Sequence, residues 1–345
     1  MKIGLVHGIA SEADRLRHAL DAPAGPYDVI WVARTAEEAV TLAGTAAPHL
    51  VLMDLATVKG DAASATRRLT AGARSAVLIM TTSVQANAAQ VFEAMGHGAL
   101  DVVDVTAGSG WADGMTGLLA KVATIARLIG DGRAPAERHR AAPTAAASAR
   151  PFLVVIGASA GGPAALADLL GRLPKDFPAA IIIVQHVEAR FTAGMAGWLG
   201  EKAALPVAVA AEGDRITGGT VLLAGTNDHL ILTPIERLRY TPEPQDGVYR
   251  PSIDVFFHSV SKHWRGDAAG VLLTGMGRDG AIGLGELRRA GHVTIAQDEA
   301  TSTVYGMPKA ATALGAAVDV LPLERIALRL QKIVACRHQG ERKPT

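Results

Sequence analysis

The sequence feature that most constrains this chain is the stretch from Val154 to Pro163, Val-Val-Ile-Gly-Ala-Ser-Ala-Gly-Gly-Pro. An apolar run stops abruptly at small residues and a helical pattern follows at once, which predicts a strand, a tight turn and a helix. Gly157, Ser159 and Gly161 satisfy the pattern G-x-S-x-G, in which flanking glycines allow a sharp turn to expose a nucleophilic serine at the end of a strand. The same stretch could instead be a glycine-rich cradle for phosphate at the start of a helix.

Length and composition exclude several classes of protein. The 345 residues are enough for two domains, 49% are hydrophobic, 19% are charged, and the net charge is +1. This balance argues against a nucleic-acid-binding protein, which needs a basic excess to neutralise phosphates. With no signal peptide and no run of about 20 apolar residues, we expect a cytoplasmic protein without membrane insertion. The single cysteine, Cys336, excludes disulfides and is expected to be buried in a helix.

Residues 1 to 130 alternate short apolar runs with helical patterns. The runs are 3–7, 29–32, 50–54, 77–81 and 101–105. Five strands alternating with helices predict an α/β domain with a doubly wound, flavodoxin-like parallel sheet. Ligands of such sheets bind at the carboxyl ends of the strands, where Asp54 closes the third run.

This first region resembles the receiver domain of bacterial response regulators, and the resemblance implies that Asp54 accepts a phosphoryl group. Receivers carry an acidic pair after the first strand to hold Mg²⁺, whereas this chain has His7 and Gly8 there. A lysine is usual after the fifth strand, where Val105 and Thr106 stand. One carboxylate does not make a Mg²⁺ site. We therefore expect a degenerate receiver that serves for packing or docking, with phosphorylation of Asp54 as the open alternative.

Residues 131–150 have no apolar periodicity and are rich in alanine, arginine and proline, which predicts a flexible linker. A second system of alternating strands and helices, residues 151–345, predicts a second doubly wound parallel α/β domain. Within it, the runs 221–224 and 229–233 are close enough in the chain to predict a β-hairpin.

A nucleophilic serine needs a base, because a serine hydroxyl is barely ionised near neutral pH. The strand after Ser159 ends at His186, and parallel strands bring their carboxyl ends to one edge of the sheet. A third strand end reads Leu-Leu-Thr-Gly-Met-Gly-Arg-Asp-Gly, and its aspartate, Asp279, could orient the imidazole. Asp279 could equally be the N-cap of the following helix. The glycines around Met276 leave backbone N–H groups that could face an oxyanion. No metal or other cofactor is required.

The dinucleotide interpretation of the same turn is weaker. It needs an acidic residue about 20 positions after the glycines to bind the ribose hydroxyls. Gln185 and His186 stand in that region instead.

Four motifs together are more specific than any one of them: Gly-Ala-Ser-Ala-Gly-Gly-Pro, Val-Gln-His, Leu-Leu-Thr-Gly-Met-Gly-Arg-Asp-Gly-Ala-x-Gly-Leu and Ala-Gln-Asp-Glu-x-Thr-Ser-x-Val-Tyr-Gly-Met-Pro. Over residues 152–330 the chain resembles the protein-glutamate methylesterases of bacterial chemotaxis. The resemblance implies that Ser159, His186 and Asp279 are the catalytic triad and that the N–H of Met276 lines the oxyanion hole. The chain departs from the family at Ala160, where threonine is usual, and at Gly225, where proline is frequent.

The function that this resemblance implies is hydrolysis of glutamate γ-methyl esters, with deamidation of glutamine by the same route. It further implies that the substrates are methylated cytoplasmic helices of chemoreceptors and that a chemosensory histidine kinase is a partner. Two other functions stay open from the residues alone. One is a nucleotide-dependent enzyme that uses the loop Gly157–Gly162, and the other is a non-catalytic module that docks receptors.

Overall fold

The computed structural model describes residues 1–21, 26–73, 75–82, 84–105, 111–130, 150–245 and 249–340. The chain divides into two compact units, Met1–Ala134 and Pro135–Thr345. The predicted linker, residues 131–150, lies outside the described residues except for Arg150. The predicted domain limits at 130 and 151 therefore stay predictions.

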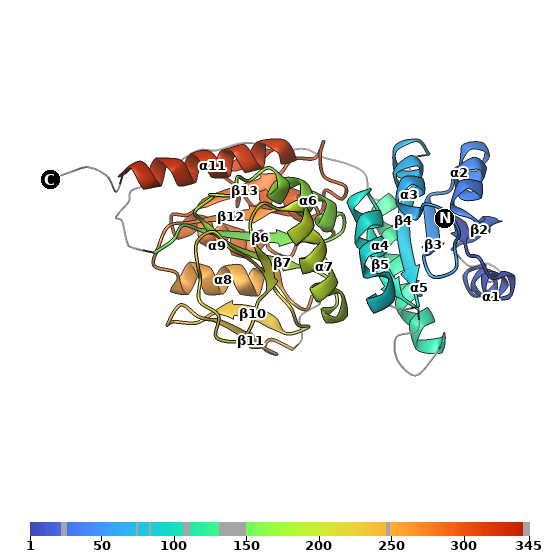
Figure 1. Ribbon diagram of the computed structural model, residues 1–345, viewed down its shortest axis with the longest axis horizontal. Helices are drawn as coiled ribbons and strands as arrows, with labels where there is room; N and C mark the ends of the chain where they lie inside the picture. The colour runs from blue at the N-terminus through green and yellow to red at the C-terminus, as the bar shows by residue number, and fades with distance from the viewer. Residues whose placement is uncertain are drawn as a thin grey trace. The chain divides into compact units, whose positions relative to one another are not determined.

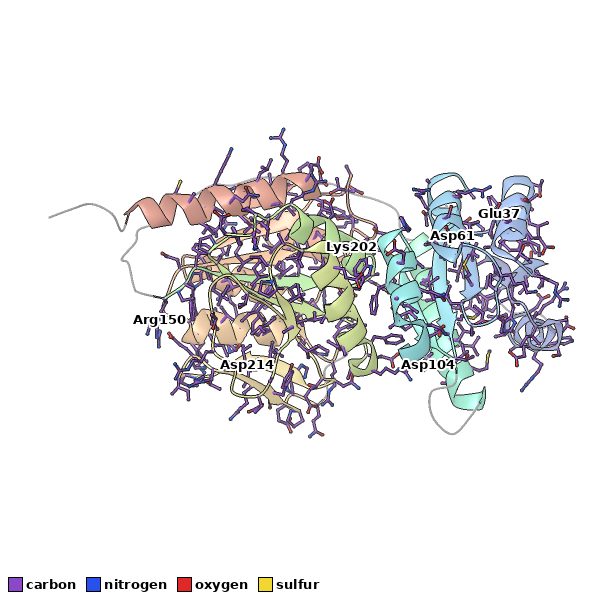
Figure 2. All side chains as sticks on the ribbon, viewed as in Figure 1. Glu37, Asp61, Asp104, Arg150, Lys202 and Asp214 are labelled. Atoms are coloured by element: carbon purple, nitrogen blue, oxygen red, sulfur yellow. The ribbon has the colours of Figure 1, made fainter. Side chains whose placement is uncertain are left out.

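The first unit is a five-stranded parallel sheet in the order β2-β1-β3-β4-β5, which is the flavodoxin-like order predicted from the sequence (Figure 1). Helices α2, α3 and α4 lie side by side. Asp61 caps α3 by accepting a hydrogen bond from the Ser64 N–H at 2.9 Å (Figure 2). The elements are β1 (Lys2–Val6), α1 (Ala10–Leu20), β2 (Asp28–Ala33), α2 (Ala36–Thr45), β3 (Leu50–Asp54), α3 (Ala62–Ala71), β4 (Ala76–Thr81), α4 (Val84–Gly96), β5 (Asp101–Asp104) and α5 (Trp111–Gly130).

The second unit is built on a seven-stranded sheet in the order β14-β13-β12-β6-β7-β9-β8, in which all neighbouring strands are parallel. Helices α8 and α9 and the hairpin β10–β11 cover one face, and α6, α7 and α11 cover the other (Figure 1). The strands are β6 (Leu153–Ala158), β7 (Ala180–Gln185), β8 (Val207–Val209), β9 (Val221–Leu223), β10 (His229–Leu232), β11 (Leu238–Thr241), β12 (Ala268–Leu272), β13 (Val293–Gln297) and β14 (Asp319–Leu321). The helices are α6 (Gly162–Gly171), α7 (Ala189–Lys202), α8 (Ile253–His263), α9 (Ala281–Arg289), α10 (Met307–Ala313) and α11 (Leu323–Gly340).

The central strands of this sheet are buried. Every residue of β6 and β7 is buried, as expected for parallel strands covered on both faces. Val155 and Ile182 belong to the same apolar cluster as Phe256 and Phe257 of α8. Truncating one of these phenylalanines to alanine should destabilise the unit by about 3–5 kcal/mol. A rigid scaffold therefore stands beneath the carboxyl ends of the strands.

The predicted hairpin is wrong in its pairing. β9 lies inside the main sheet, parallel to β7 and β8, whereas β10 pairs antiparallel with β11. The short apolar run Val221–Leu223 fits a strand buried between neighbours, and the hairpin turn forms after β10, where Glu236 takes a positive φ of 57°. Cys336 is exposed on α11, so its predicted burial is also wrong.

Both sheets have a topological switch point, where the chain leaves one strand in one direction and returns on its other side. In the first sheet this point lies between β1 and β3, and in the second it lies between β6 and β12. The predicted site residues follow these strands or their neighbours. The structure describes no helix with the length and hydropathy of a transmembrane span.

Candidate active site

Ser159 occupies the turn between β6 and α6, at the switch point of the larger sheet. Its N–H donates to the Thr274 carbonyl at 3.0 Å, and its carbonyl accepts from the Gly162 N–H at 2.7 Å. Gly161 has a φ of 74°, a conformation that favours glycine. A Cβ added at Gly161 would lie 2.5 Å from the Cβ of Thr303. The glycine is therefore required both by the sharp turn and by the close approach of a neighbouring loop.

His186 lies beside this turn because β6 and β7 are paired in register up to Ala158 and Gln185. The His186 N–H donates to the Ala158 carbonyl at 3.0 Å. The Gln185 side-chain amide donates to the Ser159 carbonyl at 2.9 Å and to the His186 carbonyl at 3.2 Å. Gln185 thus ties the two strand ends together.

One ring nitrogen of His186 is hydrogen-bonded, and the other has no hydrogen-bond partner among the described residues. Its Nε2 lies 2.8 Å from Oδ2 of Asp279. An ionised carboxylate can only accept, so Nε2 carries the proton and Nδ1 carries the lone pair. Nδ1 is buried and has no hydrogen-bond partner among the described residues. His186 therefore has a ring nitrogen that can accept a proton, on a residue whose backbone lies next to the Ser159 turn. The hydrogen bond between a nucleophile and its general base is often long in an enzyme without substrate and shortens when the substrate binds.

Asp279 is buried and receives hydrogen bonds from the first turn of α8. The Ser252 hydroxyl and the Asp254 N–H donate to Oδ1 at 2.8 and 3.1 Å, and the Ile253 N–H donates to Oδ2 at 2.7 Å. Burial alone would raise the pKa of Asp279, but the hydrogen bond from His186, the positive charge of His186 when it is protonated, and the two backbone N–H groups lower it below its ordinary value. Asp279 therefore stays ionised against His186.

The alternative role of Asp279 as the N-cap of the next helix is wrong. The N-cap of α9 is Gly280, with a φ of 84° and no side-chain capping bond. The carboxylate instead binds the N-terminus of α8, where the helix dipole favours a negative charge.

A second carboxylate stands next to Asp279. Asp254 accepts from the Gly283 N–H at 2.7 Å. Burial raises the pKa of Asp254 to about 6, the Gly283 N–H opposes this, and the negative charge of Asp279 adds to it. The charge of Asp254 therefore changes as the pH passes through about 6.

The loop after β12 passes directly over the serine. A Cβ on Gly275 would come within 2.8 Å of the Ser159 Cβ, so no larger residue fits there. The Gly275 carbonyl accepts from the N–H groups of Gly306 and Met307, which holds this loop in place. Within the described part of the chain, the N–H groups of Met276 and Ala160 donate to no other group. These two amides are the candidates for an oxyanion hole, since the residue after the nucleophile usually contributes one of its donors.

Comparisons with known proteins agree with this geometry. The sequence model of the CheB methylesterase family matches residues 154–330. A protein of Burkholderia thailandensis named protein-glutamate methylesterase/protein-glutamine glutaminase 4 is 54% identical over 344 residues, 99% of this chain and 100% of that protein. A Pseudomonas putida protein named protein-glutamate methylesterase/protein-glutamine glutaminase of group 3 operon is 53% identical, covering 97% of this chain and 100% of that protein. This chain belongs to the CheB methylesterase family.

Among solved structures, the crystal structure of the Thermotoga maritima CheB methylesterase catalytic domain is similar to part of this chain. It is 33% identical, with a TM-score of 0.51, and the match covers 53% of this chain and 98% of that domain. The resemblance inferred from the sequence motifs is thus confirmed, and the chain is an enzyme of this family. The individual roles of Ser159, His186, Asp279 and Met276 stay predictions.

Several residues hold the CheB site together through contacts that the sequence did not reveal. Thr274 donates its hydroxyl to the Ala160 carbonyl at 3.0 Å and accepts from the Val304 N–H at 2.9 Å. Gln297 accepts from the Thr274 N–H at 2.8 Å and is fully buried. Ser252 could be recognised from the sequence as a helix cap, but no local signal indicates that its hydroxyl reaches Asp279.

In the receiver-like unit of this chain, Asp54 is almost completely buried and both of its carboxylate oxygens accept hydrogen bonds. Oδ1 accepts from the Ala56 N–H at 3.3 Å, and Oδ2 accepts from the Thr57 N–H at 3.0 Å and from the Thr57 hydroxyl. His7 is also buried, and its Nε2 lies 3.7 Å from Asp54 Oδ2 and 3.4 Å from Glu12 Oε2. An imidazole thus stands where an acidic Mg²⁺ ligand would be needed, and these residues do not fit a Mg²⁺ site. Over the described ranges, no three His, Cys, Asp or Glu side chains are grouped so that they could hold a metal ion.

Proposed function

We propose that this chain hydrolyses γ-methyl esters of glutamyl side chains in a protein substrate, and deamidates glutamines, through an acyl-enzyme on Ser159. The observation that carries the proposal is the state of His186, whose Nε2 is held by Asp279 at 2.8 Å while its buried Nδ1 has no partner in the described part of the chain. In this orientation Nδ1, and not Nε2, serves as the base.

In the first half of the reaction, Nδ1 takes the proton of Ser159 as the hydroxyl oxygen attacks the ester carbonyl. Asp279 stabilises the imidazolium that results. The N–H groups of Ala160 and Met276 donate to the oxygen that becomes negative in the tetrahedral intermediate. Collapse of the intermediate expels methanol, which receives the proton from Nδ1, and leaves a glutamyl ester on Ser159. Ammonia leaves in the same way when the substrate is glutamine.

In the second half, the same base activates a water molecule, which attacks the glutamyl ester. The Ser159 oxygen takes back the proton, and the product is a glutamate side chain. Every bond made and broken is accounted for by the substrate, water and this chain, so no cofactor takes part. We further propose that the substrates are methylated cytoplasmic helices of chemoreceptors, that a chemosensory kinase is a partner, and that the enzyme works in the cytoplasm.

The test is methanol release from a methylated receptor fragment, together with labelling by a phosphonate probe for active serines. Wild-type protein should release methanol and carry the probe on Ser159, located by mass spectrometry. A chain that releases no methanol and takes no probe would instead be a docking module. Probe labelling without methanol release would point to a hydrolase with another substrate.

A further inference from the structure

The ring of Tyr249 lies flat on the imidazole of His186. The ring centroids are 4.6 Å apart and the planes differ by 6°. The Tyr249 hydroxyl lies against Gly277, since a Cβ added at Gly277 would be 2.2 Å from that oxygen. Tyr249 therefore contacts the proposed base and also the loop that carries Met276 and Asp279.

The chain on the carboxyl side of Tyr249 is anchored to the hairpin. Arg250 Nη2 lies 2.8 Å from Asp228 Oδ1, and the Ser252 N–H donates to His229 Nδ1 at 3.0 Å. Ser252 in turn donates to Asp279. The position of Tyr249 is thus set by the same short segment that holds the carboxylate.

We propose that Tyr249 is a positioning residue of the hydrolase site, which holds the plane of the His186 ring and stabilises it as it gains charge; this rests on the proposed function. A single hydrogen bond at Nε2 leaves an imidazole free to tilt, and a parallel ring removes that freedom. The face of an aromatic ring attracts a cation, so the contact strengthens when Nδ1 takes the serine proton. An interaction that is stronger in the transition state than in the ground state raises kcat and not binding.

The hydroxyl has a separate, smaller role. Burial, followed by the charge of Asp279, raises the pKa of Tyr249, while Arg278 opposes this, so the phenol stays protonated and neutral. It serves as a spacer against Gly277, whose φ of 81° already favours glycine. The stacked ring should therefore account for most of the effect.

The test compares Tyr249→Leu with Tyr249→Phe in the full chain, with kcat and KM measured on a methylated receptor fragment. Stacked aromatic pairs contribute enough for Tyr249→Leu to lower kcat roughly tenfold at unchanged KM. Tyr249→Phe should recover most of that loss. Tyr240→Leu is the matched control, because the Tyr240 hydroxyl bonds to Ala210 and Gly225 and not to His186, so this variant should lower the melting temperature without lowering kcat. Equal kcat in Tyr249→Leu and wild type, or equal losses in the Leu and Phe variants, would overturn the proposal.

A readout that needs no substrate separates this proposal from the proposed function. A stacked ring shifts the His186 Hε1 proton upfield in the NMR spectrum, and Tyr249→Leu should move that resonance downfield while Tyr249→Phe leaves it in place. An unmoved resonance in Tyr249→Leu would contradict the stacking even if the enzyme is active. If the wild type releases no methanol but the NMR shift is as expected, only the proposed hydrolysis is contradicted. The rate at which the probe labels Ser159 is then compared between wild type and the same variants. An unchanged labelling rate in Tyr249→Leu would overturn the positioning role of Tyr249.

Discussion

The two units place polar side chains at the same kind of location, the switch point of a parallel sheet, but they differ in which atoms are already hydrogen-bonded. In the smaller unit, Thr57 and Ala56 occupy the oxygens of Asp54, and His7 stands at 3.7 Å. In the larger unit, the support given to Asp279 leaves His186 Nδ1 buried and without a partner in the described residues. The larger unit thus differs in offering a buried ring nitrogen without a partner in the described residues, on a histidine that Asp279 holds in place.

The largest effect is expected from removing the nucleophile. Ser159→Ala, or His186→Ala, should lower kcat by about a millionfold, because residues that act as a unit lose most of the rate together. Asp54→Ala in the smaller unit should change the basal rate little. Ser261→Ala is a matched serine control, since the Ser261 hydroxyl donates to the His258 carbonyl within α8. Methanol release by Ser159→Ala at the wild-type rate would contradict the assignment of Ser159 as the nucleophile.

Asp279→Asn should come next, with a loss of about 10⁴-fold in kcat. An amide facing Nε2 can donate to it, which favours the tautomer whose proton is on Nδ1 and removes the base. Asp168→Asn is the control, because Asp168 pairs with Arg172 on the surface. The measurement is kcat for methanol release, and circular dichroism at the same temperature establishes that each variant is folded. A loss of less than tenfold in a folded Asp279→Asn variant would contradict the assigned tautomer.

A smaller effect concerns stability and pH. The pKa of Asp254 is about 6 in the folded protein and 3.8 ordinarily, so between these values the folded state binds more protons than the unfolded state. Asp254 therefore favours folding below about pH 4, and this contribution is lost as the pH rises through 6. Asp254→Asn should raise the free energy of unfolding above pH 6 by about 1 kcal/mol, after allowance for solvent screening. Urea unfolding at several pH values would measure it, and a difference that does not shrink toward pH 4 would refute it.

The smallest effect is expected from phosphodonors. A small phosphodonor with Mg²⁺ should leave the rate of methanol release unchanged, because Asp54 is buried and bonded and the residues of a Mg²⁺ site are missing. If the donor activates the enzyme and Asp54→Ala abolishes that activation, the degenerate-receiver interpretation is wrong.

Strand ends were the part of this molecule most predictable from the sequence. Long apolar runs that break into glycines predicted that Ser159, His186 and Asp279 would reach one edge of a sheet, and His186 and Asp279 are hydrogen-bonded there. Glycines and short polar turns are local signals, and the parallel arrangement then brings their side chains together.

The support of the site was not predictable in the same way. Ser252 and the N–H groups of α8 come to Asp279 from 25 to 27 residues away, and that contact depends on how helices pack. Local sequence offered only the nearer helix, α9, as a helix that Asp279 could cap, beside its predicted contact with His186. The hairpin was mispaired for a similar reason, because strands of three or four residues carry too little pattern to specify a partner.

The central position of β6 also governs when the enzyme can become active during its synthesis. Its partner β12 is made more than 100 residues later, and Thr274, whose hydroxyl donates to the Ala160 carbonyl, is made 114 residues after that alanine. At 5–20 residues per second, the ribosome needs about 6–23 seconds to cover that interval. During this time the serine has been translated but lacks the neighbouring strand, the loop above it and the carboxylate behind its histidine. We therefore expect a nascent or truncated chain that ends before β12 to be inactive toward esters.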